Sequence, residues 1–122
     1  MRFKQTVFLL SALSCLEANE ISSLLFNGNC LTCHNETKTI SAPSVVDIKK
    51  RYLDAFSKKD DFVDYMSKWV EHPKKETSLM HDAIKKHELM PELNLDIDTL
   101  REISAYIYET DFTKRGGRYW SD

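Results

Sequence analysis

Two cysteines and a histidine lie close together in residues 27–36, which read NGNCLTCHNE. Cys30, Cys33 and His34 form the pattern C-x-x-C-H within this stretch. Two thiols at this spacing can hold a zinc ion, cycle between dithiol and disulfide, or attach haem covalently. The remainder of the sequence helps to choose among these three chemistries.

Zinc and redox-dithiol sites need further features that this sequence does not offer. A zinc finger needs a second ligand pair about a dozen residues behind the first, whereas 47 residues separate Cys33 from the pair His81 and His87. A thioredoxin-type dithiol lies where a strand meets a helix, and the chain has no convincing strand pattern. Apart from a chance occurrence, c-type haem remains, because C-x-x-C-H is its attachment signature.

The spacing of the three residues has a physical reason. Cys30 and Cys33 are about one helical turn apart, so both sulfur atoms can reach the two vinyl groups along one haem edge and form thioethers. His34 follows directly, beneath the ring, with a nitrogen toward the iron. The flat apolar ring also enlarges the core of a chain that is small for building one by itself. We therefore predict one covalent haem c.

Composition and charge limit the remaining possibilities. The chain has 122 residues, 42% hydrophobic and 30% charged, which suits one compact domain. With only three Gly and three Pro and no internal repeat, it is neither a disordered chain nor a solenoid. The net charge is −2 and the basic residues are scattered, so the sequence lacks the basic patch typical of nucleic-acid binding.

The first eighteen residues have the features of a signal peptide. Arg2 and Lys4 precede a short apolar run at residues 7–13, and Ala18 is a suitable cleavage point. The run is too short to cross a bilayer, so we expect an exported, periplasmic protein that is not transmembrane. An ordinary amphipathic helix is one alternative. Lipid attachment through Cys15 is another, although its preceding residues match the lipoprotein pattern poorly.

Apolar residues recur at helical spacing through most of the chain, which predicts an all-α fold. Gly28 is expected to stop the first helix, whose Ile21, Leu24 and Leu25 share one side, and Ser44 to cap the second. The predicted helices cover residues 20–28, 45–56, 60–72 and 99–111, the last opening with a capping box from Thr99 to Glu102.

The region between the third and fourth predicted helices is less regular. It contains at most one short helix, around residues 80–86, and its second half reads as a loop. We expect a domain over residues 19–111, followed by a flexible tail over residues 112–122.

These elements together with C-x-x-C-H resemble a class I cytochrome c, the small bacterial monohaem type, over about residues 20–111. In that family the first helix carries an aromatic one turn before the attachment site, and Phe26 stands four residues before Cys30. The last helix carries an aromatic that packs against the first, and Tyr106 fits. The resemblance implies about four helices packed around one covalently bound haem.

The resemblance also implies how His34 is held. The family has a Pro about nine residues after the histidine, and its carbonyl accepts the proton on Nδ1; Pro43 has this spacing. The hydrogen bond fixes the imidazole tautomer and raises the basicity of the ring. Ala42 stands where Gly is common, so it is strained if that position requires positive φ.

The second iron ligand implied by the family is a Met followed by Pro, some sixteen residues before the aromatic of the last helix. Met90 and Pro91 fit, sixteen and fifteen residues before Tyr106. Met80, His87 and an open sixth position are the alternatives for this ligand.

Several other residues have two interpretations. Trp69 and Tyr52 are either core aromatics or hydrogen-bond donors to a haem propionate. Met66 lies on an apolar helical face and is expected in the core. His72 and His81 are expected to face solvent.

With both axial positions filled, no substrate reaches the iron, and the predicted function is electron transfer rather than enzyme catalysis. We expect a monomer that docks transiently with redox partner proteins. Lysines near the attachment site or the Met90 loop in sequence, such as Lys38, Lys85 and Lys86, are expected to steer an acidic partner. Two alternatives stay open. One is a haem-based sensor or gas-binding protein with an open or labile sixth position, and the other is a haem subunit of a larger redox complex.

Overall fold

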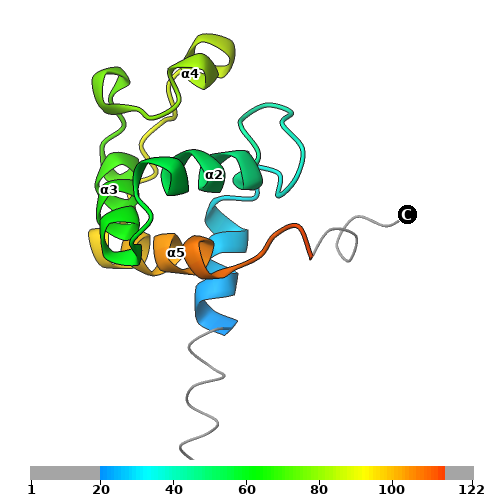
Figure 1. Cartoon of the computed structure of the whole chain (residues 1–122), viewed down its shortest axis with the longest axis vertical. Helices are drawn as coiled ribbons and strands as arrows, with labels where there is room; N and C mark the ends of the chain where they lie inside the picture. Colours follow the sequence, from blue (N-terminus) through cyan, green and yellow to red (C-terminus); the bar gives the residue numbers. More distant parts are fainter. Residues whose placement is uncertain (1–19, 115–122) are drawn as a thin grey trace, which may run out of the picture.

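A computed structural model describes residues 20–114 of the chain, and these residues form five α-helices and no strand (Figure 1). The predicted all-α class is confirmed. The helices are one over residues 20–29, α2 (Val45–Ala55), α3 (Lys59–Glu71), α4 (His81–His87) and α5 (Ile97–Glu109), with a short 3-10 helix at Lys75–Thr77.

The predicted signal peptide and the alternative at Cys15 fall on residues outside this described part. Among the helices of residues 20–114, none is both long and apolar enough to cross a membrane.

The 20–29 helix does not stop at Gly28, contrary to expectation. It continues to residue 29, and the backbone N–H of Cys30 still donates to the carbonyl of Phe26 at 2.9 Å. A Cβ placed on Gly28 would have no neighbour within 4 Å. Gly28 therefore lies at an open position inside the helix, where nothing forces the chain to turn away.

The buried side of the 20–29 helix also differs from the prediction. Ile21 and Leu24 are 53% and 69% exposed, whereas Leu25 packs partly buried against the core and Phe26 is fully buried. The Phe26 ring lies 5.3 Å from that of Tyr106 in α5, and the Tyr106 hydroxyl lies 3.4 Å from the hydroxyl of Ser23. The helix crosses α5 through its aromatic and serine side, because the small serine lets the tyrosine ring approach.

Side-chain caps fix where α2 and α5 begin. Ser44 accepts a hydrogen bond from the Asp47 N–H at 3.2 Å, which confirms the predicted cap of α2. The predicted cap of α5 was wrong by three residues: Asp96, rather than Thr99, is its N-cap. The Asp96 carboxylate accepts from both the N–H and the hydroxyl of Thr99, at 3.0 and 2.7 Å.

The core lies where α3 packs along α5. Phe62 and Met66 of α3 meet Ile103 and Ile107 of α5 in one buried cluster. Met66 is only 3% exposed, so its predicted place in the core is confirmed.

The packed part of the chain extends beyond the predicted start of the tail. Phe112 is 2% exposed, and its ring lies 5.3 Å from Phe26 and 6.2 Å from Tyr106. The end of α5 is also tied down, since Lys49 Nζ donates to the carbonyl of Thr110 at 2.7 Å. The boundary at residue 111 was too early because Phe112 supplies a third ring to the aromatic cluster. Residues 115–122 lie outside the described part.

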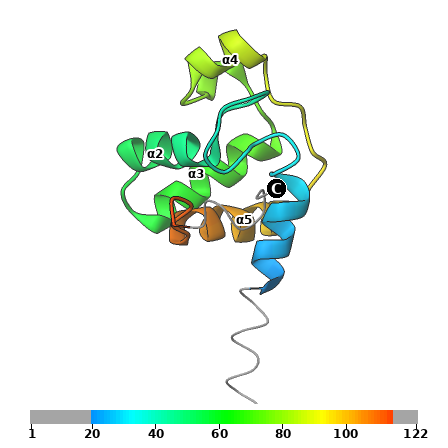
Figure 2. The same ribbon diagram turned by 90° about the vertical axis from the view of Figure 1, so that its right-hand side faces the viewer.

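The short helix α4 lies on the opposite side of α2 from α5 (Figures 1 and 2). The Arg51 guanidinium of α2 donates to both carboxylate oxygens of Asp82 at 3.0 and 2.7 Å. This pair holds the pKa of Asp82 below its usual value. A two-point contact between α2 and α4 fixes the start of α4, although most of that helix faces solvent.

We predict that Phe112→Ala lowers the free energy of unfolding by about 3 kcal/mol, because it removes a buried ring from a three-ring cluster. Urea unfolding followed by circular dichroism measures the effect. Ile40→Ala is the control: Ile40 is 70% exposed, so its truncation changes stability by less than about 0.5 kcal/mol. Equal stability of the two variants would show that residue 112 belongs to a loose tail.

Candidate cofactor-binding site

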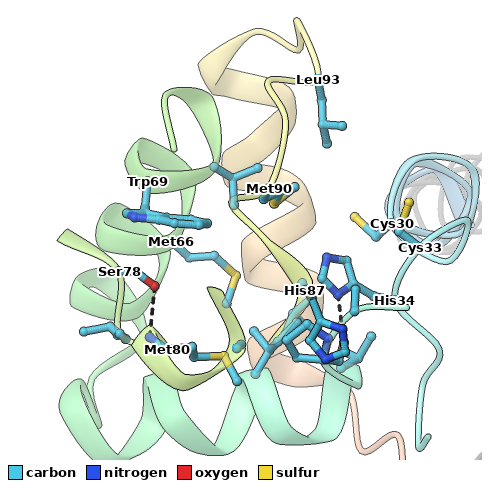
Figure 3. A pocket seen from close by; sticks show the side chains of 18 of the residues that line it. Cys30, Cys33, His34, Met66, Trp69, Ser78, Met80, His87, Met90 and Leu93 are labelled. Atoms are coloured by element: carbon cyan, nitrogen blue, oxygen red, sulfur yellow. Dashed lines mark hydrogen bonds between the residues drawn. The ribbon is translucent and has the colours of Figure 1, made fainter. Parts of the chain in front are cut away.

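The C-x-x-C-H residues border a cavity of about 300 Å³ in the interior of the helical bundle (Figure 3). This volume is within the range of small-molecule sites in proteins. Every α-helix of residues 20–114 contributes to its wall, and most of the lining side chains are apolar. Those from the helices include Phe26, Ile48, Tyr52, Met66, Trp69, Val70, Ala83, Ile84, Leu100, Ile103 and Ile107.

Cys30, Cys33 and His34 form one further turn after the 20–29 helix. The N–H of His34 donates to the carbonyl of Cys30 at 2.9 Å, and that of Cys33 donates to the same carbonyl at 3.3 Å. The two cysteines are not joined by a disulfide. Both lie at one end of the cavity, with Met66, Trp69 and Met80 at the other (Figure 3). One turn therefore brings both thiols to the same end of the pocket.

The two thiols differ in their surroundings. Cys33 is exposed, whereas Cys30 packs partly buried against the core cluster. Burial disfavours the charged thiolate and raises the pKa of Cys30 to about 11. The Cys30 thiol is therefore protonated at neutral pH.

The imidazole of His34 is held from behind by a backbone carbonyl. Its Nδ1 lies 2.8 Å from the carbonyl oxygen of Pro43, the hydrogen bond that the family resemblance implies. A carbonyl only accepts, so Nδ1 carries the proton and Nε2 keeps a free lone pair. This is the tautomer in which Nε2 can bind a metal.

The loop between His34 and Pro43 is fixed to the start of α2. The N–H groups of Val45 and Val46, which have no partner within the helix, donate to the carbonyls of Asn35 and Glu36 at 2.9 and 3.0 Å. Among the described non-glycine residues, positive φ occurs only at Glu88 and Asn94. Ala42 is therefore not strained, and its methyl group is compatible with the turn before Pro43.

Three methionines border the cavity: Met66, Met80 and Met90. Met80 was expected inside a helix, but it is the N-cap of α4, and its backbone N–H donates to Ser78 Oγ at 3.0 Å. Met90 lies in the loop between α4 and α5, as predicted. His87, the last residue of α4, also borders the cavity. The geometry thus brings together His34 and all the candidates for a second ligand.

The aromatic candidates have structural roles in the cavity wall. Trp69 lines the pocket, but its Nε1 donates to the carbonyl of Lys74 at 3.0 Å, so this N–H is not directed to a cofactor. Tyr52 is 5% exposed, and burial raises the pKa of its phenol. His72 and His81 are exposed, as expected, and the Nδ1 of His72 lies 3.2 Å from a Glu92 oxygen.

Part of the cavity wall had no signal in the sequence pattern. Leu89 and Leu93, on either side of Met90 and Pro91, line the cavity from a loop. Helical periodicity cannot indicate which side of a loop is buried.

Within residues 20–114, no three side chains of His, Cys, Asp or Glu gather as a metal-binding group. No family model, curated protein or solved structure matches the chain. The interpretation of the site therefore depends on its own geometry.

We predict that, in the chain with both thiols free, iodoacetamide at pH 8 alkylates Cys33 at least tenfold faster than Cys30. With a pKa of about 11, about one Cys30 in a thousand is thiolate at that pH. The Cys30 rate should rise about tenfold per pH unit up to that pKa. Mass spectrometry of Cys30→Ser and Cys33→Ser gives each rate separately, and equal rates would contradict the burial of Cys30.

Proposed function

We propose that the protein is a monohaem c-type cytochrome of the class I fold, with haem joined to Cys30 and Cys33 by thioether bonds. The observation that supports this proposal most is the arrangement of the C-x-x-C-H residues. One helical turn brings two unpaired thiols to the edge of a single apolar cavity, together with an imidazole whose tautomer is fixed by a hydrogen bond. A redox dithiol needs only the two cysteines, and gives no reason for the cavity or for the orientation of His34.

The residues present fit such a group. The cavity wall is mostly apolar and is formed by side chains of five helices. The two faces of a flat apolar ring need such apolar contacts. Cys33 is exposed at the edge of the cavity, which suits a cofactor whose one edge reaches the surface. His34 offers Nε2 to a metal because Nδ1 is bonded to Pro43.

Met90 is the proposed second axial ligand. Met80 borders, together with Pro43, a second cavity of about 290 Å³, and Met90 is not among the residues lining it. Because Pro43 is bonded to Nδ1 of His34, and Nε2 would hold the metal, a methionine beside Pro43 would be the poorer second ligand. The loop position of Met90 also allows its thioether to reach into the pocket.

The proposed activity is the transfer of single electrons between partner proteins. When bound, the haem supplies a one-electron couple between Fe(III) and Fe(II). The chain fixes the His34 ring, excludes water with apolar side chains and closes the distal face with Met90. A soft thioether favours the ferrous state and so raises the potential.

Docking with redox partners is proposed to be transient, as a carrier must release each partner quickly. Lys38, Lys85 and Lys86 are all exposed and are available to steer an acidic partner, with rates that fall as salt is added. Export to the periplasm, where haem c is attached, is part of the same proposal.

Covalent attachment predicts that haem stays with the polypeptide during acid-acetone extraction. Cys30→Ser and Cys33→Ser should each lose one thioether, and the double variant should lose all covalent haem. Mass spectrometry of the exported protein measures the added mass, and Ser41→Ala, at an exposed cavity-edge position, is the control that keeps it. Haem that is freely extracted from the unaltered protein would overturn the proposal.

Distal ligation by Met90 predicts that Met90→Ala abolishes the weak far-red band of methionine-ligated ferric haem and lowers the reduction potential. Met80→Ala, at a position on the same cavity, should preserve both. Absorption spectroscopy and redox titration make the comparison. The opposite pattern would assign the ligand to Met80.

A carrier with both axial positions filled predicts no spectral change when carbon monoxide is added to the ferrous protein at neutral pH. Met90→Ala opens the position and should bind the gas, unless His87, which borders the same cavity, replaces the thioether. Prompt, tight binding by the unaltered protein would support the sensor alternative instead.

A further inference from the structure

Glu88 has a backbone conformation that is rare for a residue with a side chain. It follows α4 directly, with φ 73° and ψ 173°. This region is populated almost only by glycine, because a Cβ there collides with the backbone. The second residue with positive φ, Asn94 at 57°, is of a type that tolerates the left-handed region. Of the two, Glu88 therefore carries the greater strain.

The surrounding structure holds Glu88 in this conformation. Its N–H donates to the carbonyl of Ile84 at 2.8 Å and closes the last turn of α4. The start of that helix is fixed to α2 by the two hydrogen bonds between Arg51 and Asp82. The helix is thus tied to α2 at its start and its last turn is closed, so the reversal of the chain toward the cavity takes place at Glu88.

The reversal leads directly to Met90. Leu89, Met90 and Leu93 all line the cavity, and the segment that carries them is bracketed by Glu88 and Asn94. Pro91 restricts Met90 to extended conformations. Few torsions between the two turns are thus free to adjust, so the position of the Met90 thioether depends on the torsions of Glu88.

We propose that Glu88 is a positioning residue whose strained backbone weakens the hold of the 89–93 loop on the cavity, and so makes Met90 a displaceable ligand. This inference rests on the proposed function. Release of the loop would relax Glu88, and this gain would offset part of the loss of a bond from the Met90 sulfur to the proposed haem. With haem bound, an added nitrogen base would take the place of that sulfur as ligand, with no change of oxidation state.

Imidazole binding to the ferric holoprotein tests the proposal, with the far-red methionine band as readout. Imidazole binds only while Met90 is released, so its apparent Kd rises as the released fraction falls. Glu88→Gly removes the strain and should raise the apparent Kd about tenfold. Glu88→Ala keeps the Cβ and removes the carboxylate, and should stay within about twofold of the unaltered protein. Asn94→Gly is the matched control in the same loop, with a change smaller than that of Glu88→Gly.

An unchanged or lower Kd in Glu88→Gly would overturn the proposal. An equal rise in Glu88→Ala would also overturn it, because the carboxylate and not the backbone would then be responsible.

Urea unfolding separates this inference from the proposed function. If the unaltered protein carries no covalent haem, the proposed function fails. The urea midpoints of the two Glu88 variants then test only whether the backbone at this position is strained. A higher midpoint for Glu88→Gly than for Glu88→Ala supports a strained backbone at this position, and equal midpoints refute it.

Discussion

The hydrogen bond from the His34 N–H to the carbonyl of Cys30 keeps the C-x-x-C-H residues in one helical turn, and the rest of the site depends on that turn. The turn continues the 20–29 helix, whose Phe26 is fully buried against α5 and Phe112. The direction of the two thiols is therefore set by the aromatic packing at the helix crossing. A loss of packing at Phe26 would therefore displace the two thiols as well as disturb the core.

The two sides of the cavity are built differently. On the His34 side, the imidazole is bonded to Pro43, and the loop between them is bonded to the first N–H groups of α2. On the Met90 side, a short loop approaches from a seven-residue helix that lies mostly in solvent. In the proposed cytochrome this asymmetry has a consequence. The proximal ligand has one fixed tautomer and orientation, whereas the distal ligand depends on backbone torsions at the end of α4.

Local sequence patterns predicted the structure correctly where a feature depends only on residues close together in the chain. The Ser44 cap of α2 and the helical character of α3 are of this kind, because an N-cap or an apolar stripe needs only local spacing. They failed where two local signals compete. Thr99 and Asp96 can each cap α5, and Asp96 prevails because its carboxylate accepts from both the N–H and the hydroxyl of Thr99. Gly28 permits a helix end but does not force one.

The sequence by itself determined the all-α class and the C-x-x-C-H spacing, since both depend on residues within a few positions of one another. It also supplied Pro43 as the partner of His34, through a family resemblance. Only the tertiary structure decided which side of the 20–29 helix is buried, that Phe112 joins the core, and that Met80, Met90 and His87 border one cavity. These outcomes depend on contacts between segments far apart in the chain, and on a loop whose direction is set by the backbone of Glu88 rather than by any periodic pattern.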